Sequence, residues 1–212
     1  KRRALENVYK KTYRDYLEQF ARLDLSALEK RLGVAVEGDE AVVPLFGKPY
    51  RVSRSGIVNP DGVTPTLDLC VIVSRYLILS PKTTRQGGEW VNFRDLKDSG
   101  PLTTYFRHDV ERAIAREFEG QIHRLETAAR TLGGMEPDLE ISCDLAKRFD
   151  ALPRVPVLVV FHDGDDEFPA ECSVLFESCA EDYLDPECLA MLGRFLFTSL
   201  RDASTVGAML AF

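Results

Sequence analysis

The chain has 212 residues, of which 45% are hydrophobic and 29% are charged, a composition typical of soluble globular proteins. No apolar run reaches the roughly 18 residues that a membrane-spanning helix needs. The basic start of the chain also lacks the apolar centre of a secretory signal. Five cysteines without C-x-x-C spacing favour a reduced, cytoplasmic setting over a disulfide framework.

The first third of the chain predicts two helices followed by a strand meander. Apolar and aromatic residues recur at helical spacing over residues 4–23. A shorter helix is expected at residues 25–32, with Asp24 as its N-cap and Gly33 after its last turn. Residues 34–58 switch to a period of two with glycine-containing turns, which predicts two or three antiparallel strands.

The middle third predicts a buried helix, a long connection and a long amphipathic helix. Residues 66–79 are apolar nearly all round, as in a central helix. Residues 82–103 form a connection that holds Trp90, the only tryptophan, and Phe93. A loop this long commonly carries function, so both aromatics are candidate ligand-binding residues. Residues 104–132 show a single helical stripe.

The last third predicts three strands and a final helix. Residues 139–145 and 171–178 alternate in polarity, and residues 154–162 form a continuous apolar run typical of a strand covered on both faces. Asp185 and Pro186 are the expected N-cap and first residue of the helix that follows.

Strands and helices fall in separate blocks, which indicates an α+β fold. We expect one domain over residues 1–212. In this domain the helices pack on an antiparallel or mixed sheet built from residues 34–58 and 138–177.

The net charge of −7 comes from one segment. No Lys or Arg lies between Arg154 and Arg194, although this window holds ten of the 34 acidic residues; the other 24 acids accompany 27 bases. Such a segment repels phosphates, so nucleic acid is not an expected partner. It would attract a cation, a metal ion or a basic protein surface, or it forms a solvated face.

Four acidic residues and a histidine crowd the connection between the last two predicted strands. The carboxylates offer several oxygen ligands of the kind that hard cations prefer. They are candidate ligands of a divalent metal: Asp163, Asp165, Asp166 and Glu167. With an ion held there, His162 could move protons in a metal-dependent hydrolase. The later positions of an EF-hand are missing.

The alternative for this stretch is a plain hairpin loop. Asp163 and Gly164 would then make the turn, and Phe168 and Pro169 would close the edge of the core. His162 would be an exposed residue at the end of a strand. It remains a candidate ligand-binding residue.

The cysteines allow one further hypothesis. Soft thiolates could bind zinc or an iron–sulfur cluster if the fold gathered Cys143, Cys172, Cys179 and Cys188. Cys188 is expected near a helix N-terminus, a position that lowers a thiol pKa. Cys143 and Cys172 also fit inward-facing strand positions, where buried thiols serve as small hydrophobic groups.

Several stretches resemble an uncharacterised bacterial and archaeal family known as domain of unknown function 3786. They are YLILSP, GGEWVNFRDL, ALPRVPVLVVFHDGDDEFPAECSVLF and YLDPECLAMLGRFL, which together span about residues 60 to 200. The resemblance implies no established activity. Some relatives carry a separate four-cysteine segment similar to iron–sulfur domains of anaerobic one-carbon metabolism. This sequence has no such segment, so an intrinsic iron–sulfur cluster is not expected.

The function expected from the sequence is that of an accessory protein which binds a small molecule or a partner protein. Its surface would lie between the Trp90–Phe93 loop and the acidic loop, residues 163–167. The resemblance suggests a link to anaerobic redox or one-carbon metabolism. The alternatives are a metal-dependent hydrolase at the acidic loop and a cysteine-based cluster or redox protein. A homodimer through the apolar tail, residues 205–212, is a further possibility.

Overall fold

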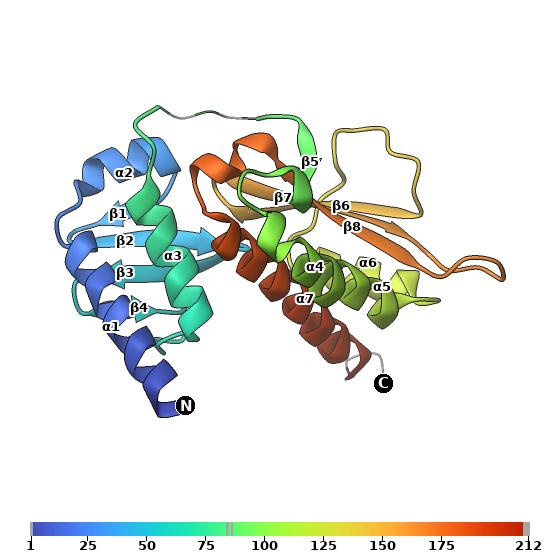
Figure 1. Cartoon of the computed structure of the whole chain (residues 1–212), viewed down its shortest axis with the longest axis horizontal. Coiled ribbons are helices and arrows are strands. Elements are labelled where there is room, and N and C mark those ends of the chain that lie inside the picture. Colours follow the sequence, from blue (N-terminus) through green and yellow to red (C-terminus); the bar gives the residue numbers. More distant parts are fainter. Residues whose placement is uncertain (1, 84, 86, 210–212) are drawn as a thin grey trace.

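The computed structural model describes residues 2–83, 85 and 87–209, with the backbone alone for residues 2–10 and 206–209. Within this part of the chain the strands form two four-stranded antiparallel sheets that lie side by side (Figure 1). No helix in the described ranges is long and apolar enough to cross a membrane. The apolar tail beyond Thr205 lies outside the side chains that the structure describes.

The first sheet is a meander in which each strand pairs with the next. Its strands are β1 (Ala35–Glu37), β2 (Glu40–Leu45), β3 (Lys48–Ser53) and β4 (Gly56–Val58). Half-buried and buried residues alternate along β2, as expected for a sheet with one covered face. The accompanying helices are α1 (Arg2–Phe20), α2 (Leu25–Leu32) and α3 (Leu67–Leu79) (Figure 1).

The second sheet has the order β5-β8-β7-β6. Its strands are β5 (Trp90–Asn92), β6 (Leu145–Leu152), β7 (Val155–His162) and β8 (Glu171–Glu177). Strand β7 is buried at every position from Val155 to Phe161, so the prediction of a strand covered on both faces is confirmed. Strand β5 arises within the connection that was expected to be a loop, and it pairs with the end of β8.

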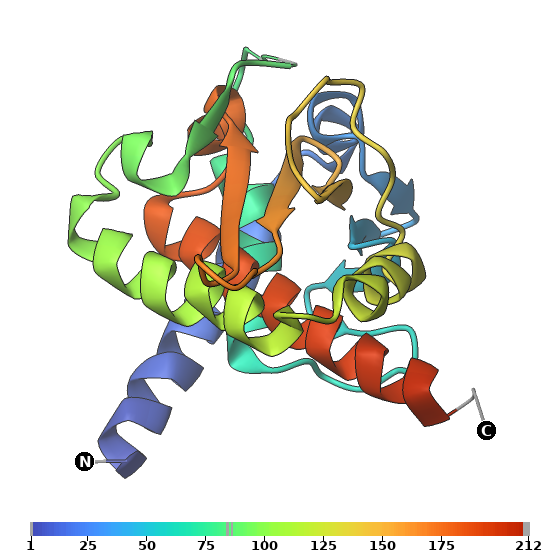
Figure 2. The same cartoon turned by 90° about the vertical axis from the view of Figure 1, so that its right-hand side faces the viewer.

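The remaining α-helices and a π-helix lie together below the second sheet in Figures 1 and 2. They are α4 (Thr103–Phe106), a π-helix (Arg107–Glu111), α5 (Arg112–Phe118), α6 (Ile122–Thr131) and α7 (Pro186–Met209). The prediction of one continuous helix over residues 104–132 is therefore wrong. The π-turns interrupt its start, and the chain leaves helical geometry at Glu119 before Gly120, whose φ of +67° suits glycine.

The predicted helix caps are present. The Asp24 carboxylate accepts hydrogen bonds from the N–H groups of Ser26 and Ala27, at 3.1 and 3.3 Å. Gly33 follows α2 in the left-handed conformation, with φ of +70°. The Asp185 carboxylate accepts a hydrogen bond from the Cys188 N–H at 2.9 Å at the start of α7.

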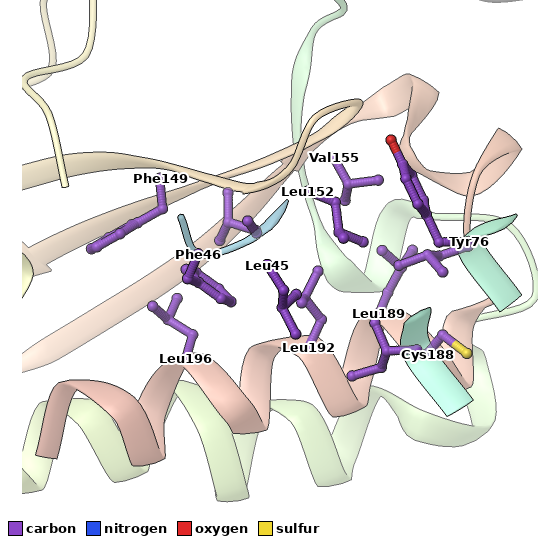
Figure 3. Close-up of a cluster of buried hydrophobic side chains, with 14 of the residues drawn as sticks. Leu45, Phe46, Tyr76, Phe149, Leu152, Val155, Cys188, Leu189, Leu192 and Leu196 are labelled. Carbon is purple, nitrogen blue, oxygen red and sulfur yellow. The ribbon is translucent and has the colours of Figure 1, made fainter. Parts of the chain in front are cut away.

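The two sheets meet at the turn between β2 and β3. The Phe46 N–H donates a hydrogen bond to the Ala151 C=O of β6 at 2.9 Å. Its ring lies against Phe149 and Phe195, with centroid distances of 6.1 and 5.7 Å. Figure 3 shows Leu192 of α7 among side chains from both sheets. One cluster of buried hydrophobic residues thus includes both sheets.

The α+β fold class is confirmed, with all the described pairings antiparallel. The two groups of strands form separate sheets rather than the single sheet that we expected. Strand β6 begins only at Leu145, so residues 139–144 are not the predicted strand.

Gly193 tests how tightly α7 packs. A Cβ at this position would lie 2.5 Å from Cε2 of the buried Phe106 ring. We expect Gly193→Ala to lower the free energy of unfolding by about 1–3 kcal/mol, because the ring must move in a packed core. Urea unfolding measures this change.

Gly100→Ala is the matched control, because no atom lies within 4 Å of a Cβ built there. A loss of stability at Gly193 no larger than the loss at Gly100 would contradict the proposed tight contact.

Candidate functional site

A cavity of about 510 Å³ lies beside the first half of β8, beyond the end of its shorter neighbour β5. Three segments line it: residues 92–94 after β5, positions within the helical stretch 103–115, and residues 169–173 at the start of β8. The volume is within the range of cavities that hold small ligands. Phe93 of the predicted aromatic loop lines the cavity, whereas no residue of the acidic loop, residues 163–167, does.

Stacked aromatic rings form the inner wall of the cavity. The Phe93 and Phe106 rings are nearly parallel, with an interplanar angle of 7° and a centroid distance of 4.2 Å. Both rings also contact Phe176 of β8. Phe93 is 2% exposed. The candidate residue Phe93 therefore lines the cavity and also belongs to the core.

Glu111, the last residue of the π-helix, is half-buried in this cavity. Its Oε1 accepts a hydrogen bond from the Val174 N–H of β8 at 3.1 Å. Burial raises the pKa of the Glu111 carboxyl above its ordinary value of 4.5, although this hydrogen bond, Arg107 and Arg94 each lower it in part. π-Turns of this kind are frequent at functional sites.

Three arginines surround the cavity: Arg94, Arg107 and Arg112. All three are exposed. Arg94 has Asp95 as an ion-pair partner at 3.7 Å. Within the described residues, the guanidinium groups of Arg107 and Arg112 form no ion pair or hydrogen bond, so their donors are available to a ligand.

Cys172 is half-buried and also lines the cavity. Burial, together with the nearby Glu111 carboxylate, raises the pKa of its thiol well above the ordinary value. The thiol is therefore protonated at neutral pH and is a poor nucleophile.

The other two residues predicted to bind a ligand lie away from the cavity lining. Trp90 is half-buried in β5, opposite Glu177 of β8. His162 is exposed at the end of β7, opposite Glu171. The position expected for His162 at an exposed strand end is confirmed.

The carboxylates of the acidic loop bind backbone N–H groups. Oδ1 of Asp163 accepts from Gly120 at 2.7 Å, which holds the loop against the turn between α5 and α6. Oδ1 of Asp165 accepts from the N–H groups of Glu167 and Phe168, at 2.8 and 2.7 Å. Within the ranges that the structure describes, no three His, Cys, Asp or Glu side chains are grouped as metal ligands.

The details expected of the hairpin loop are wrong. The loop turns at residues 165–168, where the Asp165 N–H also donates to the Phe168 C=O at 2.9 Å, and not at Asp163 and Gly164. Phe168 is 68% exposed, so it does not close the edge of the core. The turn follows Asp165 because this carboxylate caps two successive N–H groups.

Three further acids of the acidic segment also have local partners. The Glu181 carboxylate accepts from the Lys97 N–H at 2.8 Å, Asp182 pairs with Arg85, and Asp185 pairs with Arg75. These contacts attach the segment to α3 and to the connection that follows α3. Much of its negative charge is therefore used inside the fold.

The structure does not gather the four cysteines into a site. All five cysteines are free, and among the described residues none belongs to a group suited to hold a metal. The prediction of a lowered thiol pKa at Cys188 is wrong. Cys188 is buried, and desolvation and the neighbouring Asp185 carboxylate raise the pKa of its thiol.

A second cavity of about 460 Å³ lies between α6 and residues 136–147. It contains Lys147, which is 6% exposed. The Lys147 ammonium pairs with Glu136 and lies 4.0 Å from Glu126. Its charge is already balanced within the fold, so this cavity offers less to a ligand than the first.

The sequence did not identify Glu111, Arg94, Arg107 or Arg112 as site residues. All except Arg94 lie in the helical stretch, where charged residues off the apolar stripe are common. The π-turns that place Glu111 against β8 leave no simple signal in the periodicity.

Glu111 can be tested by comparing two substitutions. Glu111→Ala leaves the Val174 N–H without its acceptor and should lower the free energy of unfolding by about 1–3 kcal/mol. Glu111→Gln keeps an acceptor oxygen and should cost less. Urea unfolding of both variants measures the difference, and equal losses would contradict the hydrogen bond.

Glu111→Gln also tests the direction in which the pKa of Glu111 is shifted. Glu111 in the folded protein keeps its carboxyl proton to a higher pH than Glu111 in the unfolded chain. Ionisation of this carboxyl therefore lowers the free energy of unfolding as the pH rises through that window. The stability of Glu111→Gln relative to the unmodified protein should therefore increase as the pH rises from below the ordinary carboxyl pKa of 4.5 through the raised pKa of the folded state. A constant difference would contradict a raised pKa.

Asp165 tests the structural role of the acidic loop. Asp165→Ala removes the acceptor of the Glu167 and Phe168 N–H groups, so both amides should exchange with solvent faster in hydrogen-exchange NMR. Asp166→Ala is the control. Equal exchange rates in the two variants would show that the Asp165 turn does not hold the loop.

No curated protein and no solved structure matches the chain significantly. A family model described as Domain of unknown function (DUF3786) matches residues 24–199, which include both sheets and the whole cavity lining. The chain therefore belongs to this uncharacterised family.

Proposed function

We propose that the protein is a non-catalytic accessory binding protein and that it holds a ligand with an anionic group in the cavity beside β8. The observation that carries this proposal is the pair of arginines, Arg107 and Arg112, whose guanidinium groups form no hydrogen bond or ion pair in the described part of the chain. Arginine forms paired, charge-assisted hydrogen bonds with carboxylate and phosphate groups.

The cavity supports binding better than catalysis. Its thiol, Cys172, has a raised pKa, and its carboxyl, Glu111, already accepts a hydrogen bond from the main chain. A nucleophile needs a neighbouring base or a lowered pKa. The pKa of Cys172 is raised, and the nearby Glu111 carboxylate, which could serve as its base, already accepts a hydrogen bond from the Val174 N–H. The aromatic wall and the arginines instead suit recognition of a ligand with an apolar part and an anionic part.

We place this activity in the cytoplasm, which the five free thiols support. The ligand would be a small molecule or part of a partner protein. A link to anaerobic redox or one-carbon metabolism and a homodimer stay predictions from the sequence.

The alternatives from the sequence have less support. A metal-dependent hydrolase would need the acidic loop as its site, yet Asp163 and Asp165 each bind two backbone N–H groups. A cysteine-based redox protein would need reactive thiols, yet burial raises the pKa of Cys143, Cys172, Cys179 and Cys188.

An NMR titration with glutarate and with inorganic phosphate tests the proposal. We expect at least one of these anions to shift the backbone amide signals of residues 107–112. The double variant Arg107→Gln/Arg112→Gln should weaken binding by about tenfold or more, because hydrogen bonds between charged groups are lost.

Arg116→Gln is the matched control, because Arg116 is exposed on α5 outside the cavity lining. The neutral probe acetamide should cause no shift. An absence of shifts with both anions, or shifts that persist in the double variant, would contradict the proposal.

A further inference from the structure

In the described part of the chain, the edge of β8 beside the cavity has no neighbouring strand. Strand β7 pairs with β8 from Glu171 to Phe176. On the other side, β5 pairs only with residues 175–177. Among the described residues, the first half of β8 therefore has an open edge, and Glu171, Cys172 and Ser173 of this edge line the cavity.

The direction of the backbone groups on this edge follows from the Val174 hydrogen bond. Val174 donates its N–H to Glu111, away from β7. In an antiparallel ladder the N–H and C=O of one residue point to the same side, and this side alternates along the strand. The N–H and C=O of Cys172, two residues earlier, therefore point to the open edge as well, into the cavity.

We propose that the ligand is an extended peptide segment of a partner protein, which adds to the open edge of β8 with one acidic residue opposite Cys172. This inference rests on the proposed function of the cavity. The segment would exchange two main-chain hydrogen bonds with Cys172 and would continue the line of β5. Glu111 separates β5 from the added segment, because it already occupies the Val174 N–H.

The register explains why the residue opposite Cys172 is acidic. Opposite residues in a sheet point their side chains to the same face. Cys172 shares its face with Val174 and Phe176, and Phe176 contacts Phe106 of α4. The side chain opposite Cys172 would therefore point to the helices that carry Arg107 and Arg112, where a carboxylate finds its partners.

The surrounding charges limit this preference to one position. Glu119 accepts a hydrogen bond from the Ala170 N–H on the same edge. Glu171 lines the cavity beyond Cys172, and the acidic loop follows beyond Pro169. In the antiparallel direction, these carboxylates lie on the C-terminal side of the bound acidic residue. A second acidic residue on that side would be repelled. The segment therefore has a single acidic anchor rather than a run of acids.

A library of acetylated and amidated hexapeptides tests the inference on the full chain labelled with ¹⁵N. Glutamate is fixed at position 3, and the other positions hold all residues except Asp and Glu. A matched library has glutamine at position 3. We expect the glutamate library to yield binders that shift the Cys172 amide signal and slow the exchange of this amide with solvent. Peptides of the glutamine library should bind at least about tenfold more weakly.

N-methylation of the best peptide is the decisive step. A methyl group on the glutamate nitrogen removes the hydrogen bond to the Cys172 C=O and should weaken binding at least tenfold. A methyl group on the nitrogen of the next residue, which points away from β8, should have little effect. Arg107→Gln and Arg112→Gln should each weaken binding, whereas Arg116→Gln should not.

The outcomes separate this inference from the proposed function. If glutarate or phosphate binds at the arginines but no peptide binds, strand addition is overturned and the anion site stands. The same holds if peptides bind without any effect of N-methylation. If neither the small anions nor the peptides shift the signals of residues 107–112, both proposals fall.

Discussion

Helix α7 contacts both sheets, and the core and the cavity depend on this packing. Leu189, Leu192 and Leu196 lie among residues of the first sheet and of the β6–β7 hairpin (Figure 3). On another side of α7, the lack of a side chain at Gly193 lets the Phe106 ring approach the helix closely. Because Phe106 stacks on Phe93, the position of α7 also sets the aromatic wall of the cavity.

The cavity exists because neighbouring elements differ in length. Strand β5 has three residues and β8 has seven, so half of the β8 edge extends past its neighbour. An open edge presents unpaired N–H and C=O groups, which proteins commonly cover or cap. Here Glu111 caps the Val174 N–H and Glu119 caps the Ala170 N–H just before β8, which leaves the main-chain groups of Cys172 between them, beside the arginines. This combination of main-chain groups and positive charge is the basis of both proposals.

The acidic segment, which dominates the sequence by its charge, has a largely structural role in the described part of the chain. Carboxylates are strong acceptors for backbone N–H groups. Asp163 holds the hairpin loop against the α5–α6 turn, and Glu181 accepts from the main chain of Lys97. The segment contains no Lys or Arg between its ends, and two of its acids pair with Arg75 and Arg85, which lie elsewhere in the sequence. Other acids of the segment, Asp166, Glu167 and Glu187 among them, are exposed.

The sequence by itself determined the α+β class, most helices and strands, and the caps at Asp24, Gly33 and Asp185. These features depend on residues within a few positions of each other, so periodicity and residue type reveal them. Only the tertiary structure decided the division into two sheets, the break of the 104–132 helix and the identity of the cavity residues. The contact between Glu111 and Val174 joins residues 63 positions apart. Such a contact depends on how the π-helix and β8 pack, and the local sequence at either residue carries no signal of the other.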